Sequence, residues 1–333
     1  MKYNNLIKKI KNKLWSILLK KCKYKNLHFK LYKSYWNLLF NSRIKNNDSR
    51  QNYYSAIPNK GAGIGHQMAN WIAGYWYAKQ FDLKFAHSPF STEEWEKFLG
   101  LGENENSVDY LINTKGYKKV RLPIFDEFKL DEISLVKKII KSYGNQKIVF
   151  IAEQDQGYRD QFGVQNDIKL KFCTAASRKK DVIIYDKSKY NIAIHIRRGD
   201  ITVGQKNKHY SFLKRWQDNS YFENVLDNAL QHLKTDKEIA IYVFSQGNID
   251  DFKNFEKHEN IIFCLDMSAQ QSFLHMVNAD LLITSKSSFS FKPALLSNGI
   301  KICPKDFWHG YPKQSDWILA EEDGKINTNL IIK

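Results

Sequence analysis

Two arginines follow a buried strand in the motif His195–Asp200, whose sequence is His-Ile-Arg-Arg-Gly-Asp. The apolar run 191–196 predicts the strand, so Arg197 and Arg198 stand at its carboxyl end. Two guanidinium groups repel each other unless an anion lies beside them, and the planar fork of arginine matches two phosphate oxygens. The pattern therefore predicts a diphosphate site in which Asp200 orients one arginine. The alternative is a surface ion pair between Asp200 and an arginine, which the apolar strand makes the weaker interpretation.

A second strand end carries a cluster of hydroxyl groups, in the segment 281–290 (Leu-Leu-Ile-Thr-Ser-Lys-Ser-Ser-Phe-Ser). Ser287 and Ser288 are placed to cap the helix that follows, and the first backbone amides of such a helix are free to bind a phosphate. Capping without any ligand explains the cluster equally well. Both serines are candidates for phosphate binding on this pattern.

Two more candidates stand alone at the ends of predicted elements. His66 follows the glycine-rich turn 61–65, whose alternating glycines do not fit the Gly-x-Gly-x-x-Gly pattern of dinucleotide sites. A histidine at the start of a helix can act as a general base or can be purely structural. Asp266 follows the apolar run 261–265, where its carboxylate can accept hydrogen bonds from N1 and N2 of guanine. The alternative for Asp266 is the N-cap of a helix starting near Ser268.

The elements that must position these residues alternate between strand and helix in the C-terminal half of the chain. This alternation predicts an α/β fold with a mostly parallel, doubly wound sheet, which binds ligands outside the carboxyl ends of its strands. The predicted strands are 191–196, 239–244, 261–265, 281–284 and 300–303, and the predicted helices are 221–233, 268–277 and 289–297. Further strands are predicted at 53–57, 81–87 and 148–152, with a helix after the glycine turn.

The chain's formal charge of +17 is concentrated at its N-terminus, because residues 1–50 carry +13 and contain a single acid, Asp48. The same segment has helical periodicity, which predicts a basic amphipathic helix. Such a helix can lie on an anionic membrane surface, or it can pack on the body of the protein with a solvated lysine face. We favour the membrane surface, through residues 1–45, and we expect no nucleic-acid partner. The apolar positions on one face are Leu6, Ile10, Leu14, Ile17 and Leu18.

No segment has the roughly 20 apolar residues that a membrane-spanning helix needs, since the longest N-terminal run is 14–19. The four cysteines show neither a Cys-x-x-Cys pair nor the spacing of a metal site. No Asp-x-Asp element stands at a strand end. These observations predict a cytoplasmic protein, peripheral at the inner face of the plasma membrane, that requires no metal or other cofactor.

Taken together, the motifs resemble those of the GDP-fucose-dependent fucosyltransferase superfamily that forms α1,2, α1,6 and protein-O linkages. His195–Asp200 matches the family's His-x-Arg-Arg-Gly-Asp motif at every fixed position, and 287–290 is similar to its late Ser/Thr-Ser-Phe-Ser turn. Gly63–Met68 is similar to its Gly-x-Gly-Asn-Gln-Met turn, with His66 in place of the asparagine. This departure implies a different acceptor site, and Ile201–Trp216 contains no acid to match the glutamate base of the α1,6 branch.

The resemblance implies roles for individual residues. Arg197 would contact the donor β-phosphate, and His195 would lie by the guanine or its ribose. Arg198, Asp200, Asp266, Ser287 and Ser288 complete the donor-binding set. The reaction would be inverting and metal-independent, because Arg197 and the start of the helix at Ser287 neutralise the departing GDP. The base would be His66, Glu153 or Asp155.

The resemblance also implies a GT-B fold, with two facing Rossmann-like domains after the basic segment. The predicted divisions are residues 1–50, an acceptor-side domain at 51–185 and a GDP-sugar domain at 186–333. Fucose is the expected sugar and a glycan or lipid-linked glycan the expected acceptor. One alternative is another GDP-sugar, a deoxyhexose or heptose, in bacterial surface-polysaccharide synthesis. The other is a non-catalytic membrane- or nucleic-acid-binding adaptor, against which the intact motifs argue.

Overall fold

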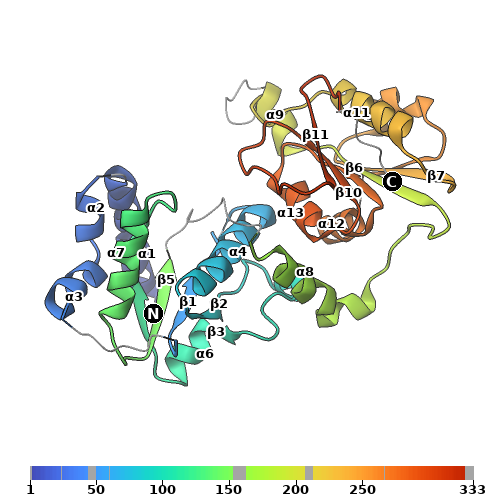
Figure 1. Cartoon of the computed structure of the whole chain (residues 1–333). Coiled ribbons are helices and arrows are strands. Elements are labelled where there is room, and N and C mark those ends of the chain that lie inside the picture. Colours follow the sequence, from blue (N-terminus) through green and yellow to red (C-terminus); the bar gives the residue numbers. More distant parts are fainter. Residues whose placement is uncertain are drawn as a thin grey trace. The chain divides into compact units, whose positions relative to one another are not determined.

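The computed structural model describes residues 2–23, 25–43, 50–59, 61–152, 163–206, 213–265 and 267–326. The chain forms two compact units (Figure 1). Unit 1 comprises residues 1–59, 69–89 and 104–161, and unit 2 comprises 60–68, 90–103 and 162–333. Each unit contains one sheet in which every described strand pair is parallel, which confirms the predicted α/β class with two Rossmann-like sheets.

The sheet of unit 2 has the order β11-β10-β9-β6-β7-β8. This is the doubly wound order, in which the chain starts at a central strand, builds outward to one edge and then returns to build the other side. The order reverses between β6 and β9, where the carboxyl ends of neighbouring strands diverge to leave room for a ligand. The strands are β6 (Tyr190–His195), β7 (Ile239–Phe244), β8 (Ile261–Cys264), β9 (Leu281–Ile283), β10 (Ile300–Pro304) and β11 (Trp317–Ala320).

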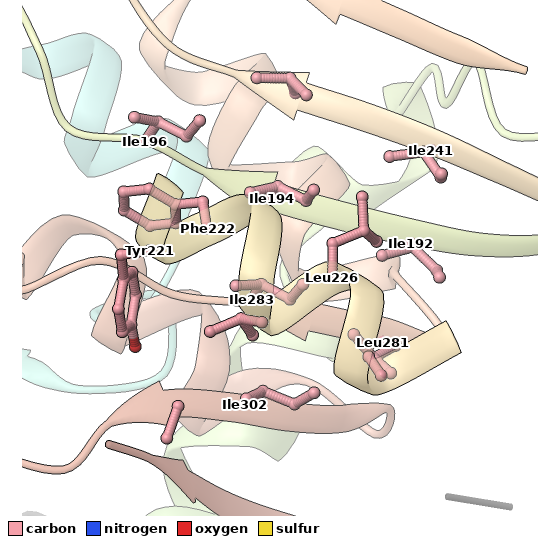
Figure 2. Close-up of a cluster of buried hydrophobic side chains, with 14 of the residues drawn as sticks. Ile192, Ile194, Ile196, Tyr221, Phe222, Leu226, Ile241, Leu281, Ile283 and Ile302 are labelled. Carbon is pink, nitrogen blue, oxygen red and sulfur yellow. The ribbon is translucent and has the colours of Figure 1, made fainter. Parts of the chain in front are cut away.

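The core of unit 2 follows from the two-residue period of β6. Ile192, Ile194 and Ile196 point to one face, where they pack against Phe222 and Leu226 (Figure 2). Ala193 lies in a separate cluster on the other face, and His195 shares that face by its register. The helices of unit 2 are α5 (Glu93–Leu99), α8 (Gln165–Thr174), α9 (Asp200–Lys206), α11 (Asn219–His232), α12 (Ala269–Asn278) and α13 (Ser288–Leu296), with 3₁₀ segments at Ala176–Lys180 and Ile249–Lys257.

Unit 1 has a five-stranded sheet in the order β3-β2-β1-β5-β4. Its strands are β1 (Tyr53–Ala56), β2 (Lys84–His87), β3 (Asn106–Ser107), β4 (Lys118–Arg121) and β5 (Ile148–Ala152). Its helices are α1 (Lys2–Cys22), α2 (Leu27–Lys30), α3 (Lys33–Asn41), α6 (Val108–Asn113) and α7 (Leu130–Lys141). Helix α4 (Ile64–Gln80) begins in unit 2 and continues in unit 1 from Ala69.

The basic N-terminal segment is part of unit 1 and does not form a division of its own. Ser34 of α3 is buried and donates a hydrogen bond to the carbonyl of Arg121 (3.1 Å). Asn37 donates to the hydroxyl of Ser142 (2.8 Å). In the part of the chain that the structure describes, no helix is both long enough and apolar enough to cross a membrane.

The division into units differs from the boundaries predicted at residues 50 and 185. Helix α8 belongs to unit 2, because Gln165 and Lys169 donate hydrogen bonds to the carbonyls of Leu295 and Ser297 at the end of α13 (3.0 and 2.9 Å). Helix α5 also belongs to unit 2, and its Phe98 ring packs against other aromatic rings of that unit. The predicted series of strands stopped at 300–303, whereas the sheet has a sixth strand, β11, paired with β10.

Candidate functional site

Strands β6 and β9 bring the two strongest sequence motifs together. They pair in parallel, with Ile194 opposite Ile283, so both strands end at the same edge and at the point where the strand order reverses. There, Arg197 Nη1 lies 3.5 Å from Ser287 Oγ, although the two residues are 90 positions apart in the sequence. The candidate site therefore lies where a doubly wound sheet binds its ligand.

Asp200 forms an ion pair with the Arg197 side chain, a contact that both interpretations of the motif predict. Its Oδ2 lies 3.0 Å from Arg197 Nη2, and it is the first residue of α9. The turn between them favours glycine, because Gly199 has φ +74°, a backbone conformation that other residues rarely adopt. The Arg197 side chain stays partly exposed, at 23% of its area, and so remains accessible to a ligand.

Arg198, predicted to bind the donor, holds the protein backbone in the structure. Its guanidinium donates to the carbonyl of Arg197 (2.9 Å) and to Asn219 Oδ1, and it lies 4.3 Å from the ring centroid of Trp216. Burial is the main cause that lowers the pKa of Arg198, to about 10. These contacts fix the main chain at Arg197 and point to a positioning role.

The serine cluster forms the start of α13. Ser287 is the N-cap and accepts a hydrogen bond from the amide of Phe289 (3.2 Å). Ser288 is the first residue of the helix, and its hydroxyl lies 2.8 Å from Nε2 of His309. The amide of Lys286 donates to Oε1 of the buried Gln217 (2.7 Å), which holds the turn. The positive end of the α13 dipole thus lies beside the Arg197 guanidinium, an arrangement that attracts a phosphate.

His195 is a buried, neutral residue of this site. Its Nδ1 lies 2.8 Å from the hydroxyl of Ser285, and its ring centroid is 5.4 Å from that of Phe289. Burial, followed by the charges of Arg197 and Arg198, lowers its pKa to about 3. A neutral imidazole with so low a pKa is a weak base, so His195 suits hydrogen bonding to a ligand better than proton removal.

His66 belongs to the same unit because the first turn of α4 packs directly on the first turn of α13. A Cβ at Gly65 would lie only 2.4 Å from the carbonyl carbon and oxygen of Ser288, so glycine permits this contact between backbones. His66 is also close enough to His309 to contribute, after burial and Lys292, to lowering the pKa of His309 to about 3. The structure therefore places the candidate base near the start of α13.

Four residues of the site were not predicted from the sequence: Arg215, Gln217, Trp308 and His309. Arg215 is half-buried. Burial and then the charge of Arg197 lower the pKa of Arg215, and the charge of Asp200 raises it. Arg215 therefore lies near both Arg197 and Asp200. Its guanidinium carbon lies 5.4 Å from the ring centroid of Trp308, the neighbour of His309. The aromatic sequence Phe-Trp-His-Gly-Tyr at 307–311, after a predicted strand, was a usable signal. No signal in the sequence pointed to Arg215 or Gln217.

A pocket of about 220 Å³ adjoins the site through Trp216, Gln217 and Lys286. Five carboxylates and two lysines, Lys286 among them, line the pocket, so the lining carries a net negative charge. An acidic pocket repels phosphates, so it suits them less well than the positive centre at Arg197 and the start of α13. The carboxylates belong to Asp218, Asp306, Glu321, Glu322 and Asp323, and the other lysine is Lys305.

Three of the predicted site residues, Asp266, Glu153 and Asp155, lie outside the described residues. The N-cap of α12 is Ser268, whose hydroxyl accepts from the amide of Gln271 (3.2 Å). The assignment of guanine to Asp266, and of the base to either acid, therefore stays a prediction.

The two low-pKa histidines predict a loss of stability in acid. Burial holds the pKa of His195 and of His309 at about 3 in the folded protein, below the usual 6.5. Between these values only the unfolded chain binds the proton, so the free energy of unfolding falls as the pH decreases from 6.5 towards 3. Each histidine contributes up to about 1.4 kcal/mol per pH unit.

Denaturant unfolding of wild type and His309→Gln at pH 7, 6, 5 and 4 measures the contribution of His309. The stability advantage of the wild type should shrink below pH 6.5. A constant difference across the series would contradict the prediction.

The sequence matches the model of glycosyl transferase family 11 over residues 118–314, more than half of the chain and including both motifs of the site. No curated protein sequence matches it. Among solved structures, POFUT1 in complex with GDP is similar at a TM-score of 0.47 and 10% identity, covering 77% of this chain and 99% of that one. A variant of Arabidopsis thaliana FUT1 in complex with GDP has a TM-score of 0.46 and 12% identity, with coverage of 92% and 81%. E. coli heptosyltransferase WaaC with ADP has a TM-score of 0.38 and 11% identity, with coverage of 81% and 93%.

These structural similarities are too weak to bear on function. The sequence match alone shows that the chain belongs to glycosyl transferase family 11, and it is therefore a glycosyltransferase.

Proposed function

We propose that this glycosyltransferase transfers fucose from GDP-fucose to a glycan acceptor, with inversion and without a metal ion. The observation that carries the proposal is the 3.5 Å approach of Arg197 to Ser287 at the point where the strand order of unit 2 reverses. A guanidinium and a helix N-terminus at one place form a positive centre, which suits a diphosphate. The motif resemblance to GDP-fucose-dependent enzymes supports guanine as the base and fucose as the sugar.

In the proposed reaction, the bond between the anomeric carbon of fucose and the β-phosphate oxygen breaks, and GDP leaves with the electron pair. Arg197 and the first amides of α13 stabilise the negative charge that develops on GDP. An acceptor hydroxyl attacks the anomeric carbon from the opposite face, and its proton passes to a general base, for which His66 is our candidate. Neutral His195 would bind the guanosine part of the donor.

Arg215 supplies a second cation in this proposal. It lies near Arg197 and Asp200, and its charge is partly shielded from water, which strengthens its interaction with an anion. Arg198 is committed to Trp216 and Asn219, so Arg215 is the better candidate for the second guanidinium on the diphosphate. In this arrangement Arg198 acts by holding the backbone from which Arg197 extends.

The donor class is tested by calorimetric titration of the full chain with GDP, UDP and CMP. We expect binding of GDP in the micromolar range and no detectable heat from UDP or CMP. If none of the three nucleotides binds the folded protein, the proposed function is wrong. Equal binding of all three would leave the phosphate site in place and reject the assignment of guanine.

Chelation tests the metal-free mechanism. Because protein groups supply the positive charge, turnover of GDP-fucose is expected to stay within about twofold of its starting value in excess EDTA. The measurement is release of GDP from the donor, before and after addition of Mg²⁺ or Mn²⁺. Loss of turnover in EDTA that either ion restores would contradict this part of the proposal.

Another GDP-sugar, such as a deoxyhexose or heptose, is the second candidate donor. The contacts that carry the proposal all face the phosphates, so they hold any GDP-sugar equally well. A hydrolysis screen of several GDP-sugars separates the two candidate donors. If another GDP-sugar reacts faster than GDP-fucose, that GDP-sugar is the donor. A protein that binds GDP but hydrolyses none of them, with or without acceptors, would reject both candidate donors.

A further inference from the structure

Among the side chains that the structure describes, one side of helix α1 packs against the rest of unit 1. The ring of Trp15 packs edge-on against Tyr32 at a centroid distance of 5.4 Å, and Arg121 lies 5.5 Å from the Trp15 ring. Leu19, one turn further on, is buried. Six large apolar side chains of the same helix remain exposed by 38 to 61% of their area: Leu6, Ile7, Ile10, Leu14, Ile17 and Leu18.

These six side chains form one stripe. At about 100° per residue they fall within an arc of roughly 120°, centred on the side away from Trp15 and Leu19. Lys9, Lys13 and Lys20 line one edge of this apolar stripe, and all three are exposed. Helix α1 contains seven lysines and no acid, so every charged side chain of the helix beside the stripe is positive.

We propose that α1 docks on an anionic lipid surface, with the apolar stripe at the level of the acyl chains and the lysines at the phosphates. A lipid surface accommodates both features at once, because apolar side chains leave water while lysines meet negative headgroups. Docking of a second copy through the stripe would bring two rows of lysines together, and their repulsion opposes it. A nucleic acid would engage the lysines but would leave the apolar stripe in water.

The experiment is flotation of the full chain with two kinds of vesicle, pure phosphatidylcholine and phosphatidylcholine with 30% phosphatidylglycerol. We expect binding to the anionic vesicles, little binding to the neutral ones, and weaker binding as the salt concentration rises. Leu14→Glu should reduce binding at least tenfold, because it places a charge within the stripe. The triple variant Lys9→Gln, Lys13→Gln, Lys20→Gln should also lose at least tenfold, since each lysine near an anionic surface is worth about fivefold.

Matched controls separate docking from general changes in charge and polarity. Leu130→Glu introduces the same charge at the start of α7, at a side chain that is 81% exposed. The triple variant Lys118→Gln, Lys137→Gln, Lys138→Gln removes three exposed lysines elsewhere in unit 1. Both controls should bind like the wild type, and unchanged melting temperatures confirm that all the variants fold.

Three results would overturn the proposal: no binding of the wild type to the anionic vesicles, equal losses in the α1 variants and their controls, or a concentration-dependent dimer that Leu14→Glu abolishes. Binding to duplex DNA with no binding to vesicles would assign the surface to nucleic acid instead. The readout contains no nucleotide, so its outcome is independent of the proposed donor.

Discussion

Replacing Arg197 by alanine is expected to reduce GDP affinity about 10- to 100-fold and donor turnover about 100- to 1,000-fold. The guanidinium lies 3.5 Å from Ser287 at the start of α13, and Asp200 pairs with it. Turnover should fall more than affinity because the negative charge on GDP grows as the sugar leaves. Arg198 does not replace it, since its guanidinium is committed to Asn219 and Trp216.

Calorimetric titration with GDP and measurement of GDP release from GDP-fucose test this prediction. Arg197→Lys keeps the charge but loses the planar fork, so its losses should be intermediate. Lys305→Ala is the control, because it removes a cation of the same unit that pairs with Glu321 at 2.7 Å. Wild-type affinity and turnover in Arg197→Ala would place the donor elsewhere.

Substituting Gly65 by alanine is expected to destabilise the protein by roughly 1–3 kcal/mol and to reduce turnover about 100-fold. The added methyl group would lie 2.4 Å from the carbonyl of Ser288, so α4 and α13 must move apart. That movement changes the position of His66 relative to the start of α13. A shift of about 1 Å at a catalytic site is enough for a loss of this size.

Gly63→Ala is the matched control, because it is the same substitution two residues earlier and nothing lies within 4 Å of the added methyl group. Its stability and turnover should stay close to those of the wild type. Thermal unfolding and GDP release measure the two effects. Equal behaviour of the two alanine variants would mean that the approach of α4 to α13 does not support the site.

Much of unit 2 was predictable from local patterns. The strands β6, β7, β8, β9 and β10 lie within one or two residues of the predicted runs, because buried parallel strands are continuous apolar segments. The contact between Arg197 and Ser287 was also foreseeable, since parallel strands of one sheet end at the same edge. In unit 1, the strands β3 and β4 were missed, because β3 has two residues and β4 has a single apolar residue, a valine, among three charged ones.

By itself, the sequence determined the α/β class, the two motifs at the strand ends and the basic N-terminal helix, because each depends on residues close together in the chain. Only the tertiary structure decided which side chains lie together at the candidate site. It turned Arg198 towards Trp216, brought Arg215 near Arg197 and set the backbone of Gly65 against Ser288. These contacts depend on strand order and on packing between distant segments, for which local periodicity contains no information.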